Sequence, residues 1–243
     1  MIKTVSAFFI ACAFFVLSFA QSPQDKTVIT GKEMEIKKSG DVIVSRGDSK
    51  AVSGRNIIKS DEMTYDKKKS LVTAAGNVRL FSKTDEGEPV EAYGGFAKYY
   101  TDTDKGKLWG KGTKIKYHMK SSEKPLLLKA GEIYIDKNLE TLSAYIDVEV
   151  ITSSGVIYSD NAVFDKKSDR VIMEKDKKRP VADVIYDERK GLYEADTMIF
   201  YNADDNKKIV MKGDVTGKIQ MEDRIPGIED KSSKAKKGVQ DKK

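Results

Sequence analysis

The stretch Ser60–Leu80, SDEMTYDKKKSLVTAAGNVRL, contains the pattern from which the fold is built. Its first part alternates, so that Met63 and Tyr65 share one face of a strand. One aspartate and three lysines follow, a run that is too polar for a buried strand and indicates a turn. The chain then returns as a second alternating run that is interrupted by Gly76. This stretch therefore predicts a β-hairpin whose second strand bends at a glycine.

The same pattern recurs along the chain at intervals of about 29 to 36 residues, a spacing typical of repeat proteins. Each copy has one large apolar residue just before its turn. A second apolar residue lies two positions before that residue, and a third lies seven or nine positions after it, beyond the turn. The six residues before the turns are Ile36, Tyr65, Tyr99, Ile135, Phe164 and Phe200, and those after them are Ile43, Val72, Leu108, Leu142, Val171 and Ile209. Six copies in phase predict an internal repeat. Tyr100 competes with Tyr99 for the inward position of the third copy.

Residues 1–20 have the features of a secretory signal peptide. Lys3 precedes an apolar run, and Ser18-Phe19-Ala20 forms a small-x-small cleavage site. The run is shorter than the roughly 20 residues of a membrane-spanning helix; retention as an inner-membrane anchor is the alternative to cleavage. Cys12 is the only cysteine, so the cleaved protein has neither disulfides nor a thiolate site. Export without disulfides favours a bacterial periplasm.

The net charge of +6 does not indicate nucleic-acid binding, because of where the charge lies. Lys3 carries one unit, and the stretch from Lys231 to Lys243 carries a net of five. The remainder is formally neutral, whereas a nucleic-acid binder concentrates basic charge on its folded surface. We therefore expect no nucleic-acid partner and a disordered Lys-rich tail over residues 226–243.

Between the signal and the tail, short alternating segments are separated by turns rich in Asp, Asn, Gly and Lys, and no helical stripe is present. This organisation is typical of an all-β sandwich, jelly roll or open barrel. Motifs for catalysis are lacking. His118 is the only histidine, and it has no sequence neighbour that would complete a catalytic triad or a metal site. The turn at Asp102 and Asp104 has a threonine where a calcium loop needs its closing glutamate. Trp109 is expected in the core or in a groove wall. We expect no enzyme, no metal site and no cofactor.

Two phrases of the sequence resemble the LptA/OstA family of lipopolysaccharide-transport proteins. They are Gly87-Glu88-Pro89-Val90-Glu91-Ala92, which precedes an alternating strand, and Ala75-Gly76-Asn77-Val78-Arg79-Leu80. The signal peptide and the Lys-rich C-terminus fit the same family. The resemblance implies an antiparallel, twisted β-jelly roll over residues 21–225, located in the periplasm. It also implies lipopolysaccharide or a related glycolipid as ligand, partners similar to LptC and LptD, and head-to-tail assembly of copies into a bridge.

Exposing an acyl chain of about a dozen carbons to water costs on the order of 10 kcal/mol, so a lipid carrier needs a long apolar channel. Repeated strands with one apolar face are able to build such a channel. The alternative is a structural β-repeat scaffold of the cell envelope with a filled core and no lipid. The residues expected to line the groove are Met34, Ile36, Ile43, Met63, Tyr65, Val72, Val78, Leu80, Tyr99, Leu108, Ile133, Ile135, Leu142, Val148, Phe164, Val171, Met173, Met198, Phe200, Ile209, Met211 and Val215.

Overall fold

The computed structural model describes residues 27–118, 120, 124–136, 139–186, 189–202 and 208–220. The predicted signal peptide and the tail from residue 226 lie outside them. The strands are β1 (Val28–Thr30), β2 (Glu33–Lys37), β3 (Val42–Ser53), β4 (Asn56–Asp66), β5 (Leu71–Lys83), β6 (Pro89–Tyr100), β7 (Lys105–Trp109), β8 (Lys114–Tyr117), β9 (Leu126–Lys129), β10 (Glu132–Asp136), β11 (Thr141–Thr152), β12 (Gly155–Asp165), β13 (Arg170–Glu174), β14 (Val181–Tyr186), β15 (Arg189–Glu194), β16 (Thr197–Tyr201), β17 (Lys208–Lys212) and β18 (Thr216–Gln220).

The predicted fold class is confirmed, because all strand pairings are antiparallel and the described helices are three single 3-10 turns. These turns are η1 (Lys38–Gly40), η2 (Lys67–Lys69) and η3 (Lys166–Ser168). In the described part of the chain, no helix is long and apolar enough to span a membrane.

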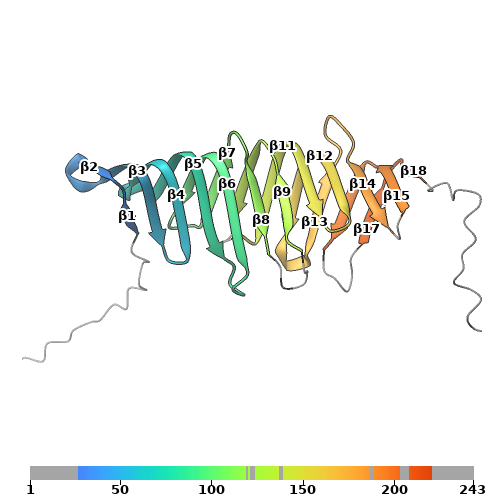
Figure 1. Ribbon diagram of the computed structural model, residues 1–243, viewed down its shortest axis with the longest axis horizontal. Coiled ribbons are helices and arrows are strands. Elements are labelled where there is room, and N and C mark those ends of the chain that lie inside the picture. Colours follow the sequence, from blue (N-terminus) through green and yellow to red (C-terminus); the bar gives the residue numbers. More distant parts are fainter. Residues whose placement is uncertain are drawn as a thin grey trace, which may run out of the picture.

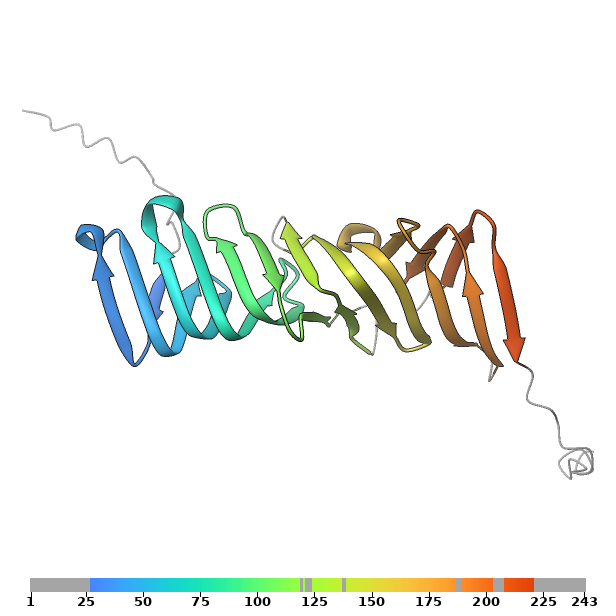
Figure 2. The same ribbon diagram turned by 90° about the horizontal axis from the view of Figure 1, so that it is seen from above.

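The strands form one continuous sheet that is folded into two layers along an elongated roll (Figures 1 and 2). Six long strands, β3, β4, β5, β6, β11 and β12, cross from one layer to the other. The short strands β2, β7, β10, β13, β16 and β17 complete layer I, and β1, β8, β9, β14, β15 and β18 complete layer II. The N-terminal strands lie at one end of the roll and β17 and β18 at the other (Figure 1).

The long strands change layer at β-bulges. In β5 the pairing shifts between Ala75 and Val78, where Gly76 has φ +75° and Asn77 φ +48°. A Cβ on Gly76 would lie 2.4 Å from a carboxylate oxygen of Asp61, so the bend that the sequence predicts at this glycine has a steric basis. The bulges join the layers covalently along one edge of the roll. At the opposite edge, which we call the seam, the hairpin turns of the two layers meet.

Candidate functional site: the apolar interior and its seam

A continuous apolar row runs along the inside of layer I. Its members are direct cross-strand partners on twelve successive strands, and eleven of the twelve belong to the predicted repeat. In spatial order the row is Ile36, Ile43, Tyr65, Val72, Tyr99, Gly106, Ile135, Leu142, Phe164, Val171, Phe200 and Ile209. The predicted repeat is therefore the unit that places one strand pair in this row.

The third copy differs from its predicted register. Tyr99 pairs with Gly106, and Leu108 pairs with Ala97 instead, because the turn of this copy is two residues shorter than expected. Tyr99 is 4% exposed and Tyr100 is 41% exposed, so Tyr99 holds the inward position.

Layer II has a matching inner row that the repeat pattern largely missed. Its cross-strand partners are Ile29, Ala51, Ile58, Leu80, Ala92, Ile115, Leu128, Val150, Ile157, Ala182, Tyr193 and Gly217. Period-2 alternation in short segments such as Lys114–Tyr117, KIKY, was the available signal, but each segment is too short to be recognised on its own.

Most residues of the predicted groove lie on the inside. Fifteen are buried: Met63, Val72, Val78, Leu80, Tyr99, Leu108, Ile133, Ile135, Leu142, Val148, Phe164, Val171, Met173, Met198 and Phe200. Four are half-buried: Ile43, Tyr65, Ile209 and Met211. Met34, Ile36 and Val215 are 48%, 67% and 50% exposed, because they lie at the two ends of the roll, where no further strand covers them. The apolar interior is thus closed along its length and uncovered at both ends.

The side chains of the two layers pack on each other in the middle of the roll. Phe164 of layer I contacts Tyr117 of layer II with ring centroids 5.1 Å apart, and both rings are at most 1% exposed. Ile133, Leu142 and Phe164 are 0% exposed. The space between the layers is therefore filled by side chains in the middle of the roll.

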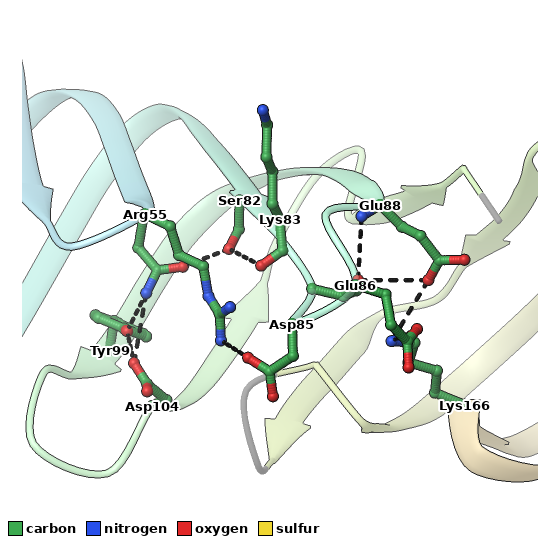
Figure 3. A network of polar contacts seen from close by, with 11 residues as sticks. Arg55, Ser82, Lys83, Asp85, Glu86, Glu88, Tyr99, Asp104 and Lys166 are labelled. Atoms are coloured by element: carbon green, nitrogen blue, oxygen red, sulfur yellow. Dashed lines mark hydrogen bonds and ion pairs between the residues drawn. The ribbon is translucent and has the colours of Figure 1, made fainter. Parts of the chain in front are cut away.

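The seam is crossed by two groups of polar contacts (Figure 3). In the first, Asn56 of layer II donates its side-chain N–H to the hydroxyl of Tyr99 in layer I over 2.7 Å, and Tyr99 donates to Asp104. Ser82 donates to the amide oxygen of Asn56 over 2.5 Å. Burial, together with the hydrogen bond to Asp104, raises the pKa of Tyr99. This phenol therefore stays protonated and acts as a donor across the seam.

In the second group, Lys166 of the layer I turn η3 contacts Glu86 and Glu88 of the layer II turn between β5 and β6, with 3.5 Å to the Glu88 carboxylate. Tyr117 and the backbone N–H of Lys120 also donate to Glu88, over 3.1 and 2.9 Å. Burial alone would raise the pKa of Glu88, but the hydrogen bonds and the Lys166 charge together lower it.

The side chains of Lys166 and Glu88 are only 11% and 8% exposed. Both residues lie in or beside polar turns, yet their charged groups are largely withdrawn from solvent. We call Glu88 and Lys166 the seam ion pair.

Two cavities flank these contacts. One, of about 960 Å³, lies between Arg55 and Asn56 of layer II and Lys67 and Asp102 of layer I. The other, of about 510 Å³, lies beside the seam ion pair. Both are lined mainly by polar side chains, so the mouth of the apolar interior along the seam is polar.

Trp109 differs from its expected place in the core or a groove wall. It lies on the outer face of layer I, stacked on Phe96 with centroids 5.7 Å apart, and Lys107 lies 5.6 Å above its ring. Leu108 beside it takes the inward position, because successive side chains of a strand alternate. Within the described residues, no group of three or more His, Cys, Asp or Glu side chains is arranged to hold a metal ion.

Comparison with known proteins gives three findings. Residues 24–141 match the family described as "LptA/(LptD N-terminal domain) LPS transport protein". Among solved structures, the chain is similar to LptH, the LptA-homologous periplasmic component of the lipopolysaccharide transport device from Pseudomonas aeruginosa. The sequence identity is 17% and the TM-score is 0.46, and the match covers 54% of this chain and 99% of LptH. No curated protein matches significantly. Residues 24–141 are therefore similar to the LptA/LptD N-terminal domain family of lipopolysaccharide-transport proteins.

Proposed function

We propose that this protein, whose residues 24–141 match a family of lipopolysaccharide-transport proteins, is a carrier that holds the acyl chains of lipopolysaccharide between its two layers. The observation that carries the proposal is the pair of in-register apolar rows that run from end to end of both layers. Such rows give an unbranched apolar path, which is what a lipid with several long chains requires.

Lipid enters through the seam, because the opposite edge is closed by the strands themselves. Separating the layers at the bulges would break backbone continuity, whereas opening the seam breaks the Tyr99 and Glu88 contacts and the packing behind them. The polar saccharide then remains at the polar mouth while the acyl chains lie inside.

We also propose that copies, or related rolls similar to LptC and LptD, join end to end. Each layer contains twelve antiparallel strands, an even number, so its two edge strands run in opposite directions. A second copy shifted along the roll axis therefore presents β2 antiparallel to β17, and β1 antiparallel to β18. The edge strand β2 carries Glu33 and Glu35, and β17 carries Lys208 and Lys212, so the two edges also differ in charge. A periplasmic bridge after cleavage of residues 1–20, with the roll over 21–225 and a dispensable tail, is the assembly that we propose.

The packed interior by itself also suits a structural β-repeat scaffold with a filled core. Site-specific photo-crosslinking in lipopolysaccharide-producing cells separates the two functions. A photoreactive residue at Val72, which is 1% exposed, should crosslink to lipopolysaccharide, whereas one at the neighbouring outward-facing Thr73 should not. Equal labelling at the two positions, or none at Val72 in a folded protein that yields no glycolipid by mass spectrometry, would favour the scaffold.

A further inference from the structure

The outer face of layer II carries a row of cations in direct cross-strand register. Lys50 pairs with Lys59, Lys59 with Arg79, and Arg79 with Tyr93; Tyr93 pairs with Lys114, and Lys114 with Lys129. We call the five cations of this series the basic row. They span five strand intervals, which corresponds to about 24 Å at ~4.8 Å per strand. We propose that the basic row binds a flexible anionic saccharide that bears phosphate or carboxylate groups.

The arrangement of like charges is the first argument. Like charges directly opposite each other destabilise a sheet, and here three cations follow one another on β3, β4 and β5. Within the described residues, Lys50, Lys59, Arg79 and Lys114 have no ion pair within 4.0 Å; Lys129, the last of the row, pairs with Glu149 at 2.8 Å. An external anion would remove this repulsion.

Cations on the outer face of layer I lie next to acidic residues. Arg46 of β3 lies opposite Glu62 of β4, with 3.5 Å between the charged groups, and Lys107 of β7 contacts Glu132 of β10 at 2.8 Å. These two cations therefore have acidic partners within the protein, although Lys98 of β6 also lies directly opposite Lys107. In the described part of the chain, layer II thus carries a run of unpaired cations on successive strands, although residues 21–230 as a whole are formally neutral.

A cavity of about 530 Å³ lies at the start of the basic row and is lined by its first three members. Two acids also line it, but both have partners. Asp48 forms an ion pair with Lys32 at 2.7 Å, and Asp61 accepts a hydrogen bond from Asn77 over 2.8 Å. Because Asn77 is neutral, Asp61 keeps its charge; the three cations outnumber it, so the cavity is a concave site with net positive charge, which suits an anionic group.

Aromatic rings accompany the cations: Tyr93 lies between Arg79 and Lys114, and Phe81 lies beside Lys59. The Lys59 ammonium is 5.8 Å from the Phe81 ring centroid and that of Lys114 is 5.1 Å from the Tyr93 centroid. Sugar rings stack on such faces while their anionic groups reach the neighbouring ammonium groups. Adjacent strands rotate by roughly 20° each, so the row turns by about 100° along its length. A flat bilayer touches only part of such a row, whereas a flexible chain follows it.

This proposal goes beyond the carrier function, because it needs neither an acyl chain nor an open seam. The test measures binding of fluorescent oligogalacturonate and of phosphorylated dextran to the full mature chain, with uncharged dextran and anionic phospholipid vesicles as comparisons. The variant is Lys59→Gln/Arg79→Gln. The matched control, Lys98→Gln/Lys111→Gln, removes the same charge from exposed positions off the row.

Both anionic saccharides should bind the wild type and the control alike. The Lys59→Gln/Arg79→Gln variant should lose at least tenfold in affinity, and its binding should depend less steeply on salt concentration, because it makes fewer charge contacts. Its melting temperature should be unchanged or higher, because repulsion within the row is reduced. Equal losses in both variants, binding only to vesicles, or no binding of either anionic saccharide would overturn the proposal.

Discussion

Removing Lys166 from the seam ion pair tests how the two layers are held together. The substitution Lys166→Met leaves the Glu88 carboxylate buried without its cation, and breaking a buried pair in this way costs about 3–5 kcal/mol. Glu88 keeps its hydrogen bonds from Tyr117 and Lys120, and Glu86 is 64% exposed and adds little, so we expect the lower end, about 3 kcal/mol. For a domain of this size that corresponds to a melting temperature lower by roughly 6–12 °C.

The assay combines thermal unfolding followed by circular dichroism with the rate of lipopolysaccharide crosslinking at Val72. Lys166→Met should unfold earlier and take up lipid faster, since one seam contact is lost. Lys167→Met is the matched control, because Lys167 is the next residue in the same turn and is exposed. In Lys166→Met/Glu88→Gln, loss of both charges should recover about 2 kcal/mol of the destabilisation. A melting temperature equal to that of Lys167→Met, or additive effects in the double variant, would refute the reasoning.

Three further expectations concern pH, the bulges and the ends. The pKa of Glu88 is lowered and that of Lys166 is raised, so the pair's contribution is lost as pH falls through the Glu88 pKa and as it rises through that of Lys166. The difference in melting temperature between wild type and Lys166→Met/Glu88→Gln should therefore be constant between about pH 5 and pH 10 and shrink on either side. A difference that keeps growing toward acid would contradict the stabilising role of the charged Glu88. Ile146 is a β-branched residue with φ +71° in the bulge of β11, a strained conformation. The substitution Ile146→Gly should therefore raise the free energy of unfolding by about 1 kcal/mol, as measured by urea unfolding. A loss of stability would show that the side-chain contacts of Ile146 outweigh the backbone strain. Proline at Ile209 or at Val210 of β17 should separate folding from assembly, because only one of two adjacent residues points its N–H away from β16. One of the two variants should stay folded but fail to form end-to-end oligomers in analytical ultracentrifugation. Oligomers in both variants would exclude β17 as the assembly edge.

The strand content, the repeat and one inner face were predictable from the sequence because their causes are local. The alternation around Met63 and Tyr65 determines which side chains share a face, and Gly76 marks the bend because only a few residues adopt its backbone conformation. Spacing along the chain predicted the strand register less well where the turn length changed. Tyr99, for example, pairs with Gly106 and not with Leu108.

Contacts between distant segments were decided only by the tertiary structure. Glu88 and Lys166 are 78 positions apart and look like ordinary turn residues, yet the twist of the roll brings their turns together and buries both charges. The basic row likewise joins residues of five different strands, from Lys50 to Lys129, each unremarkable in its own segment. Sequence alternation states on which face a side chain lies; which side chains meet across the seam or along a face depends on strand order, register and twist, and these are set by the packing of the whole sheet.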